Sequence, residues 1–121
     1  MKRCAGLAGV LFLTVASICN AENGEVAVNN GSELLKICIA AVQLQDGVPN
    51  ADRFDAGHCV GFLEGVVLAD DAKSITCIPG GVSFGQLARV VRRYLVEHPE
   101  KLHLHRFPLT KRILADTFPC N

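Results

Sequence analysis

Apolar residues recur every three to four positions in three segments of the chain, which is the spacing of an amphipathic helix. The pattern predicts helices over residues 31–44, 83–98 and 108–118, whose apolar faces would form the core of an all-α bundle. The positions that carry the pattern are Leu34, Leu35, Cys38, Ala41 and Val42 in the first segment, Phe84, Leu87, Ala88, Val91, Tyr94 and Leu95 in the second, and Leu109, Ile113, Leu114 and Phe118 in the third.

A fourth segment, residues 55–71, has glycine at 57, 61 and 65 and alanine at 69, one helical turn apart. Glycine inside a helix costs roughly 0.5–1 kcal/mol relative to alanine, so three on one face call for a compensating interaction. We predict that Gly57, Gly61 and Gly65 let a neighbouring helix approach closely, and that this segment is the central helix of a bundle of four main helices. Two short turns interrupted by glycine are the alternative interpretation.

Polar residues and prolines mark the expected helix ends. Asn30 and Ser83 each precede a Glu or Gln by three positions, which is the spacing of a capping box. Asp55 is predicted to cap the glycine-bearing helix. Residues 98–99 end the third helix, because the residue before a proline avoids helical geometry. Pro108 is well placed to open the last helix.

The first 21 residues have the pattern of a secretory signal peptide. Lys2 and Arg3 precede an apolar run over residues 5–18, and small residues stand before a predicted cleavage site after Ala21. Residues 22–121 would then form one mature domain exported to the periplasm. The apolar run is short for a membrane span, and no other stretch reaches about 18 apolar residues, so we expect no membrane embedding after cleavage.

Four cysteines, at positions 38, 59, 77 and 120, remain in the predicted mature chain. An even set in an exported protein favours two disulfides. Zinc is the competing reading, but the cysteines stand about twenty residues or more apart without a C-x-x-C pair. If the first two helices are antiparallel neighbours, Cys38 and Cys59 meet, which leaves Cys77 with Cys120. The sequence alone permits three pairings.

The charges of the chain are divided between its two halves. Residues 22–71 hold nine acidic and two basic side chains, net −7, whereas residues 72–121 hold eight basic and three acidic, net +5. Solvated faces that meet within the fold are the ordinary interpretation. The alternative is a polarised surface that attracts a partner or a second copy. Nucleic acid is not expected as a partner, because the total charge is close to zero and the chain carries an export signal.

No pattern of catalytic or metal-binding residues stands out. His98, His103 and His105 are close in sequence, but the segment contains a proline and lacks two histidines at i and i+4 on one helical face. A disulfide at Cys59 would leave no thiolate beside His58. Residues 80–81 follow a proline as a turn and do not open a phosphate-binding loop. We therefore predict that the protein is not an enzyme and uses no cofactor or metal.

The ordered motifs of the mature chain resemble the Rap/Tai immunity proteins of type VI secretion. The resemblance extends over nearly all of residues 22–121. It rests on Gly31, Leu34, Leu35 and Cys38; on residues 58–63, HCVGFL, with Gly65; on Cys77, Ile78 and Pro79 with Gly81, Val82 and Gln86; on Val90, Val91, Tyr94 and Leu95; on His98, Pro99, Glu100 and His103; and on Phe118, Pro119 and Cys120.

This resemblance implies a small, mostly helical periplasmic protein, often a homodimer, that binds and occludes a secreted peptidoglycan amidase and thereby protects the cell from its own or a sister cell's toxin. The chain departs from the family pattern at His58, Phe62 and Gly80, and in residues 106–108 where a small-residue helix start is usual. Exposed loops on a rigid scaffold commonly carry binding residues. We therefore expect the partner to contact the connection over residues 98–107 and the predicted helix before it, residues 83–98. The predicted contact residues are His98, His103, His105, Arg106 and Phe107, with Arg92 and Arg93 second.

Two other functions compete with this one. A periplasmic acid-stress chaperone would expose apolar surface at low pH, and four histidines and twelve carboxylates give the chain titratable groups for such a response. An acid aggregation assay separates this function from protection against an amidase. A structural module of a secretion apparatus is the third reading, which co-purification with envelope machinery would favour.

Overall fold

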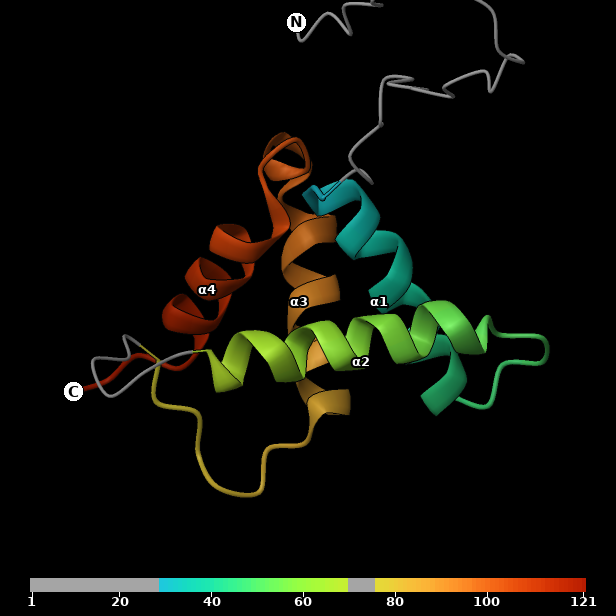
Figure 1. The fold of residues 1–121 in the computed structure, drawn as a ribbon, viewed down its shortest axis with the longest axis horizontal. Coiled ribbons are helices and arrows are strands. Elements are labelled where there is room, and N and C mark those ends of the chain that lie inside the picture. Colours follow the sequence, from blue (N-terminus) through green and yellow to red (C-terminus); the bar gives the residue numbers. More distant parts are fainter. Residues whose placement is uncertain (1–28, 70–75) are drawn as a thin grey trace, which may run out of the picture.

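The computed structural model describes residues 29–69 and 76–121. These contain four α-helices and one short 3₁₀ helix, and no strand was assigned within them; the predicted all-α bundle of four main helices is confirmed (Figure 1). The predicted signal peptide, residues 1–21, and the predicted end of the second helix at Asp71 lie outside the described residues. The elements are α1 (Gly31–Gln45), α2 (Arg53–Leu68), α3 (Phe84–Glu97), η1 (Pro99–Lys101) and α4 (Arg106–Thr117).

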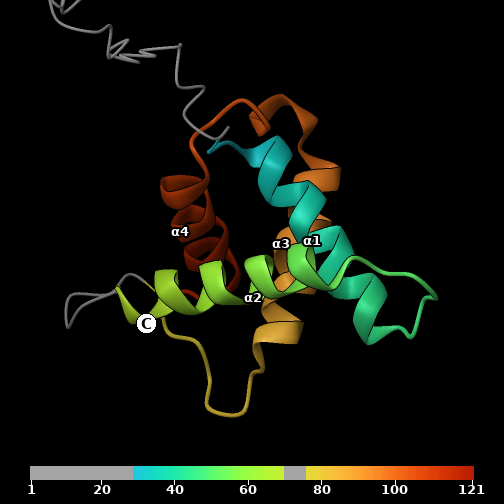
Figure 2. The same ribbon diagram turned by 45° about the vertical axis from the view of Figure 1, so that its right-hand side comes forward.

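Helices α1, α3 and α4 stand beside one another, and α2 crosses them on one side of the molecule (Figures 1 and 2). Each helix turns its apolar side chains toward the space between them. Fully buried residues from all four helices form one continuous core, which includes Leu34, Leu63, Leu95 and Ile113 at 0 % exposure. A single close-packed core of this kind holds the outer faces of the helices in fixed positions.

The central helix is α1, not α2 as predicted. Both helices pack against each of the other three, but α1 contributes seven buried residues and α2 contributes four. The reason is position: α2 lies across the outside of the bundle and buries only one side. Its buried residues are Ala56, Cys59, Leu63 and Val66.

The predicted close packing at the glycine row is also wrong within one chain. A Cβ atom built on Gly57, Gly61 or Gly65 would meet no atom within 4 Å, because this row faces away from the bundle. The close approach occurs instead at Gly31, where a Cβ would lie 2.9 Å from Leu109 Cδ2 and 3.0 Å from the Cα of Leu102. The absent side chain at Gly31 therefore brings the start of α1 against the segment that leads into α4.

Both disulfides pair as the sequence reasoning preferred. Cys38 of α1 joins Cys59 of α2, and both are fully buried in the core. Cys77 joins Cys120 near the carboxyl end, and the backbone amide of Cys77 donates to the carbonyl of Phe118 at 2.8 Å. One bridge thus holds α2 on α1, and the other holds the chain end beside the segment that precedes α3.

The helix starts follow local capping, with two corrections. Asn30 accepts from the amide of Glu33, and Ser83 forms the predicted capping box with Gln86. Helix α2 is capped by Asp52 and not by Asp55, whose own amide donates to the Asp52 side chain at 3.0 Å. Helix α4 begins at Arg106 and not at Pro108, which occupies the third helical position, where its missing N–H costs no helical hydrogen bond.

The connection between α3 and α4 is fixed to the start of α1. The amide of Gly31 donates to the carbonyl of Leu104 at 2.9 Å, and the amide of Arg106 donates to the carbonyl of Asn29 at 2.8 Å. These bonds surround an isolated bridge between Asn30 and His105. The segment predicted to contact a partner is therefore an ordered part of the fold.

Candidate protein-binding surface

Helix α3 separates an apolar inner face from a basic outer face. Leu87, Ala88, Val91 and Leu95 are buried, as the apolar period predicted. Arg89, Arg92 and Arg93 are exposed on the outer side of the helix. Val96 stands among them with 57 % of its surface exposed. The outer face thus combines three guanidinium groups with an apolar side chain.

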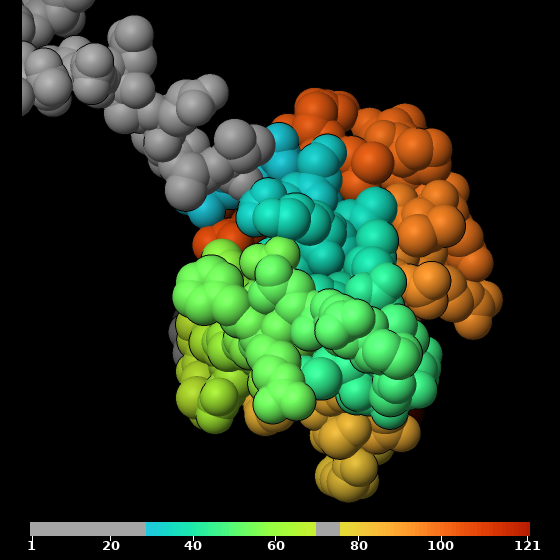
Figure 3. Space-filling model, turned by 90° about the vertical axis from the view of Figure 1, so that its right-hand side faces the viewer, coloured from blue at the N-terminus to red at the C-terminus, as the bar shows by residue number. Residues whose placement is uncertain are grey.

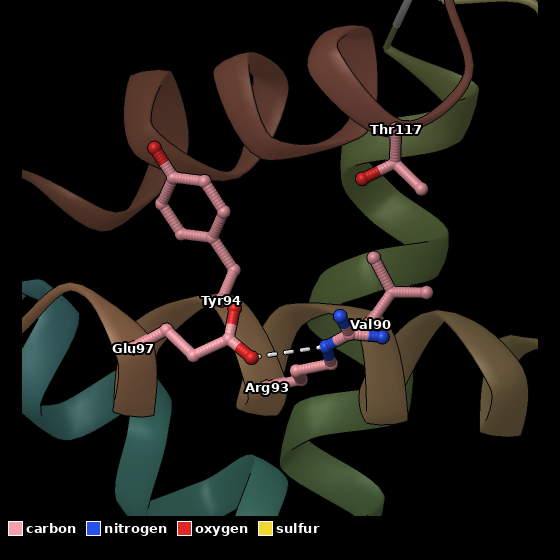
Figure 4. Close-up of a pocket in the computed structure, with 5 residues that line it drawn as sticks. All are labelled: Val90, Arg93, Tyr94, Glu97 and Thr117. Atoms are coloured by element: carbon pink, nitrogen blue, oxygen red, sulfur yellow. Dashed lines mark hydrogen bonds and ion pairs between the residues drawn. The ribbon is translucent and has the colours of Figure 1, made fainter.

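Two hollows follow this outer face. The first, of about 250 Å³, lies between α3 and the end of α4 and is lined by Val90, Arg93, Tyr94, Glu97 and Thr117 (Figure 4). Within it, Arg93 Nε donates to Glu97 Oε1 at 3.1 Å. The second, of about 340 Å³, shares Arg93 and Glu97 and adds Arg89, Arg92 and Val96. The two hollows are therefore neighbours on one surface.

A third hollow, of about 400 Å³, lies between α3, the connection and α4. Tyr94 lines both this hollow and the one in Figure 4, so the two adjoin. Lys101 donates a hydrogen bond to the Tyr94 hydroxyl, and its Nζ lies 5.0 Å from the centroid of the ring. The lining of this hollow combines apolar side chains with basic ones. The lining residues are Tyr94, Lys101, Leu104, His105, Pro108, Leu109 and Arg112. We call the residues that line these three hollows the α3–α4 surface.

Apart from Arg106, the predicted contact residues of the connection have different surroundings, and one of them, His105, lines the α3–α4 surface. His98 ends α3, packs against Tyr94 with ring centroids 4.3 Å apart and the ring planes tilted by 40°, and its Nδ1 lies 3.2 Å from Glu100 Oε1. His103 is exposed. His105 lines the third hollow, and its ring nitrogen accepts from the amide of Phe107 at 3.4 Å. Phe107 is 38 % exposed.

Arg106 faces α2 and not the α3–α4 surface. Its guanidinium carbon lies 4.7 Å from the centroid of the Phe62 ring, and its Nη1 lies 3.4 Å from His58 Nε2. Cation–π contacts of this kind hold an arginine against an aromatic ring. His58, Phe62 and Arg106 together form one contact between α2 and α4. The main role of the Arg106 side chain is therefore to join α4 to α2.

Ion pairs offset the basic charge of the α3–α4 surface only in part. Arg89 binds Asp46 at the end of α1, which joins the acidic and basic halves of the chain. Other pairs lie within one half, among them Lys36 with Asp55 at 3.3 Å, Arg93 with Glu97 at 3.1 Å and Arg112 with Asp116 at 3.3 Å. From residue 76 to the end the chain has seven Lys and Arg against three Asp and Glu. The surface consequently keeps a positive potential.

Two carboxylates near these groups are held in the charged form. The hydrogen bond from Arg89 lowers the pKa of Asp46 below its ordinary value, and the same bond raises the pKa of Arg89. The pKa of Glu100 is lowered by a hydrogen bond from its own backbone amide and then by His98. Both carboxylates therefore stay negative at neutral pH and offset part of the basic charge beside them.

Sequence reasoning missed several residues of this surface. The apolar period places Tyr94 in the buried stripe, yet it is half-buried and lines two hollows. The period does not point to Lys101 or Arg112, although they line the third hollow. Helical spacing is the signal that could identify Arg112, because it stands one turn after Pro108 and Leu109, on the same side of α4.

The groups on this surface suit the binding of a macromolecule. Guanidinium and ammonium groups bind carboxylates, and Tyr94, Leu104 and Val96 offer apolar contact area. Among the described residues, no three His, Cys, Asp or Glu side chains gather as ligands for a metal ion. Within that same part of the chain, no helix is long and apolar enough to cross a membrane.

The chain was compared with curated proteins, solved structures and protein-family models. No curated protein and no solved structure matches the chain. A family model described as Rap1a immunity proteins matches residues 30–120, which spans all four helices and all four cysteines of the two disulfides. The chain therefore belongs to the Rap1a family of immunity proteins.

Proposed function

We propose that this immunity protein works in the periplasm, where it binds and occludes a peptidoglycan amidase effector of type VI secretion and so protects the cell from self or sister-cell toxin. Immunity proteins neutralise a partner effector by contact and require no chemistry of their own. Membership of an immunity protein family supports this role. Two disulfides suit an oxidising compartment such as the periplasm.

The observation that carries the proposal is the basic, hollowed α3–α4 surface on a rigid core. Three adjoining hollows offer places for partner side chains, and Arg92 and Arg93 stand exposed beside them. Charge on such a surface speeds encounter with an acidic partner and orients it. The surface is built on helices, so little conformational entropy is lost when the partner binds.

The proposal is tested with purified amidase effectors and isolated cell-wall fragments. Wild-type protein should bind its effector stoichiometrically and stop release of peptidoglycan fragments. Replacing Arg92 and Arg93 together with glutamate should weaken the complex by at least about tenfold, because each change places like charge against the partner. Arg53→Glu is the matched control, since Arg53 is exposed on α2 in the acidic half.

The connection is tested separately with His103→Ala and His105→Ala. Arg106 stays unchanged in this variant, because its contacts with Phe62 and His58 join α2 to α4 and their loss would disturb the fold. Weaker inhibition with an unchanged circular dichroism spectrum would place the partner on the connection. Full inhibition by both sets of variants, equal to that of Arg53→Glu, would exclude the α3–α4 surface as the binding site.

A further inference from the structure

The third hollow of the α3–α4 surface differs from the other two in its charge. Glu97 lines both of the others, whereas none of the residues that line the third hollow is acidic. Its cationic groups belong to Lys101 and Arg112. The apolar lining residues are Leu104, Pro108 and Leu109. A hollow of about 400 Å³ that combines apolar walls with two cations and no carboxylate suits an anionic group beside an apolar one.

Both cations have hydrogen-bond donors beyond those that bind within the chain. A lysine ammonium has three N–H donors, and Lys101 directs one of them to the Tyr94 hydroxyl. Arg112 binds Asp116 through Nε at 3.3 Å, and a guanidinium has four further N–H donors on its two terminal nitrogens. Charged donors of this kind form short, strong hydrogen bonds with carboxylates. A carboxylate is therefore the anion that fits the hollow.

Side chains, rather than backbone amides, provide the recognition here. The Nδ1 atom of His105 accepts from the amide of Phe107, so in the neutral ring the hydrogen is on Nε2, which can donate to the same carboxylate. The amide of Leu104 donates to the carbonyl of Lys101 at 3.0 Å. The amide of Leu109 donates to the carbonyl of His105 at 3.2 Å. The arrangement thus suits a carboxylate side chain better than a chain end held by a row of backbone amides.

The start of α1 holds the wall of this hollow in place. The amide of Gly31 donates to the carbonyl of Leu104 at 2.9 Å, and the amide of Ser32 donates to the carbonyl of Leu102 at 3.0 Å. Figure 3 shows the orange residues of the connection against the cyan start of α1. Leu109, which lines the hollow from α4, is only 4 % exposed. A wall fixed in this way loses little conformational entropy when a partner binds.

We propose that the effector inserts a Glu or Asp side chain into this third hollow, together with an apolar side chain beside it. The carboxylate binds Lys101 and Arg112, and the apolar side chain packs on Leu104 and Pro108. A charge pair that is desolvated in this way contributes more to the complex than exposed pairs at the rim. The inference rests on the proposed function and goes further, because it names the chemical groups that the partner supplies.

The first test compares Arg112→Gln with Asp116→Asn. Both variants break the same ion pair, whose arginine side chain is 74 % exposed, so both should fold like wild type. Only Arg112→Gln removes a cation from the hollow. We expect it to weaken binding of the purified amidase effector by at least about tenfold, whereas Asp116→Asn should bind at least as tightly as wild type. Isothermal titration without cell wall measures both affinities.

The apolar part of the site is tested by Leu104→Ser against Val48→Ser. The two side chains are 41 % and 42 % exposed, but Val48 lies between α1 and α2, outside the α3–α4 surface. Leu104→Ser should weaken the effector complex by at least about fivefold, because it removes apolar contact at the hollow. Val48→Ser should bind like wild type.

A zero-length cross-link identifies the group that the effector supplies. A carbodiimide activates a carboxylate, which forms an amide with a lysine amine in contact with it. In the oxidised complex, Lys101 should become joined to an Asp or Glu of the effector, and mass spectrometry of the digest locates the bond. Lys101→Arg keeps the charge and should lose only the cross-link. Lys36 is the matched control, because it is exposed but pairs with Asp55 in the acidic half of the chain.

The outcomes separate this inference from the proposed function. If the protein blocks the amidase, but Arg112→Gln binds as tightly as Asp116→Asn or Lys101 never joins an effector peptide, the inference is overturned and the proposed function stands. Binding of wall fragments alone that Arg112→Gln abolishes would assign the hollow to the wall and would also overturn the inference. A protein that binds no amidase effector overturns both.

Discussion

Helices α2 and α3 have similar inner faces and very different outer faces. Each buries four residues in the common core. Outside, α2 presents three glycines between Phe54 and Leu68, whereas α3 presents Arg89, Arg92 and Arg93. The contrast shows that burial of the inner faces determines the fold and leaves the outer faces free to differ. One outer face is apolar and poor in side chains, and the other carries exposed guanidinium groups.

The largest expected effect tests the equivalence of the two inner faces. Leu63 of α2 and Leu95 of α3 are both 0 % exposed. Leu63→Ala and Leu95→Ala should each lower the free energy of unfolding by about 2–5 kcal/mol, through lost burial and the cavity left behind. Urea denaturation at a concentration that keeps the protein monomeric measures both values.

Leu68→Ala is the control for this pair, because it makes the same substitution on the outer face of α2. Its effect on the monomer should stay within about 0.5 kcal/mol. A loss at Leu68 as large as the loss at Leu63 would mean that the outer face is covered within one chain.

The helices were predictable from sequence because their apolar period and their caps are local signals. Ser83 and Asn30 cap as expected, and Leu87, Ala88, Val91 and Leu95 of the α3 stripe are buried as expected. The start of α2 was misplaced because Asp52 and Asp55 both have the right chemistry, and the helix begins at the earlier one. Local rules choose the type of capping residue, but they do not decide between two candidates three positions apart.

The glycine row shows what spacing alone leaves open. A row of small residues permits close approach, but the sequence does not say from which side a neighbour comes. Only the packing of Cys59 and Leu63 against α1 turns the glycines outward. In the same way, Arg106 contacts His58 across 48 residues of sequence, so its packing role depends on the assembled fold. The exposed arginines of α3 could be placed because their positions follow from the helix itself.

Added salt should distinguish the basic outer face of α3 from the apolar core. Effector binding through the α3–α4 surface, which rests on the proposed function, should weaken by about tenfold between roughly 0.05 and 0.5 M salt, because ions screen exposed charges. The free energy of unfolding should change far less, since burial of apolar area is its main driving force. Urea denaturation and effector titration across the same salt series measure both. An affinity that does not change with salt would contradict the assignment of the α3–α4 surface.

Replacing either of two glycines with alanine should change the stability of the protein by a smaller amount and with opposite signs. The comparison tests whether the α2 face is exposed. Gly61→Ala should raise the stability of the monomer by about 0.5–1 kcal/mol, because alanine restricts the unfolded chain and its Cβ meets nothing in the folded one. Gly31→Ala should lower it, because the new Cβ would lie 3.0 Å from the backbone of Leu102. Thermal unfolding of the two variants gives the signs, and stabilisation at Gly31 would contradict the packing described here.

The smallest expected effect concerns Asp46 and Arg89, the pair that joins the acidic half to the basic half. The pair lowers the pKa of Asp46 in the folded protein, so its contribution to stability is present above the unfolded pKa and is lost as pH falls through the folded pKa. Asp46→Asn should therefore be slightly less stable than wild type at neutral pH, and the difference should vanish in acid. The effect is small because both side chains are about half exposed and water screens the pair. Urea denaturation of wild type, both single variants and Asp46→Asn with Arg89→Gln, at neutral and acid pH, isolates the coupling between the two residues. A coupling that persists in acid would mean that the two halves are joined here by packing and not by charge.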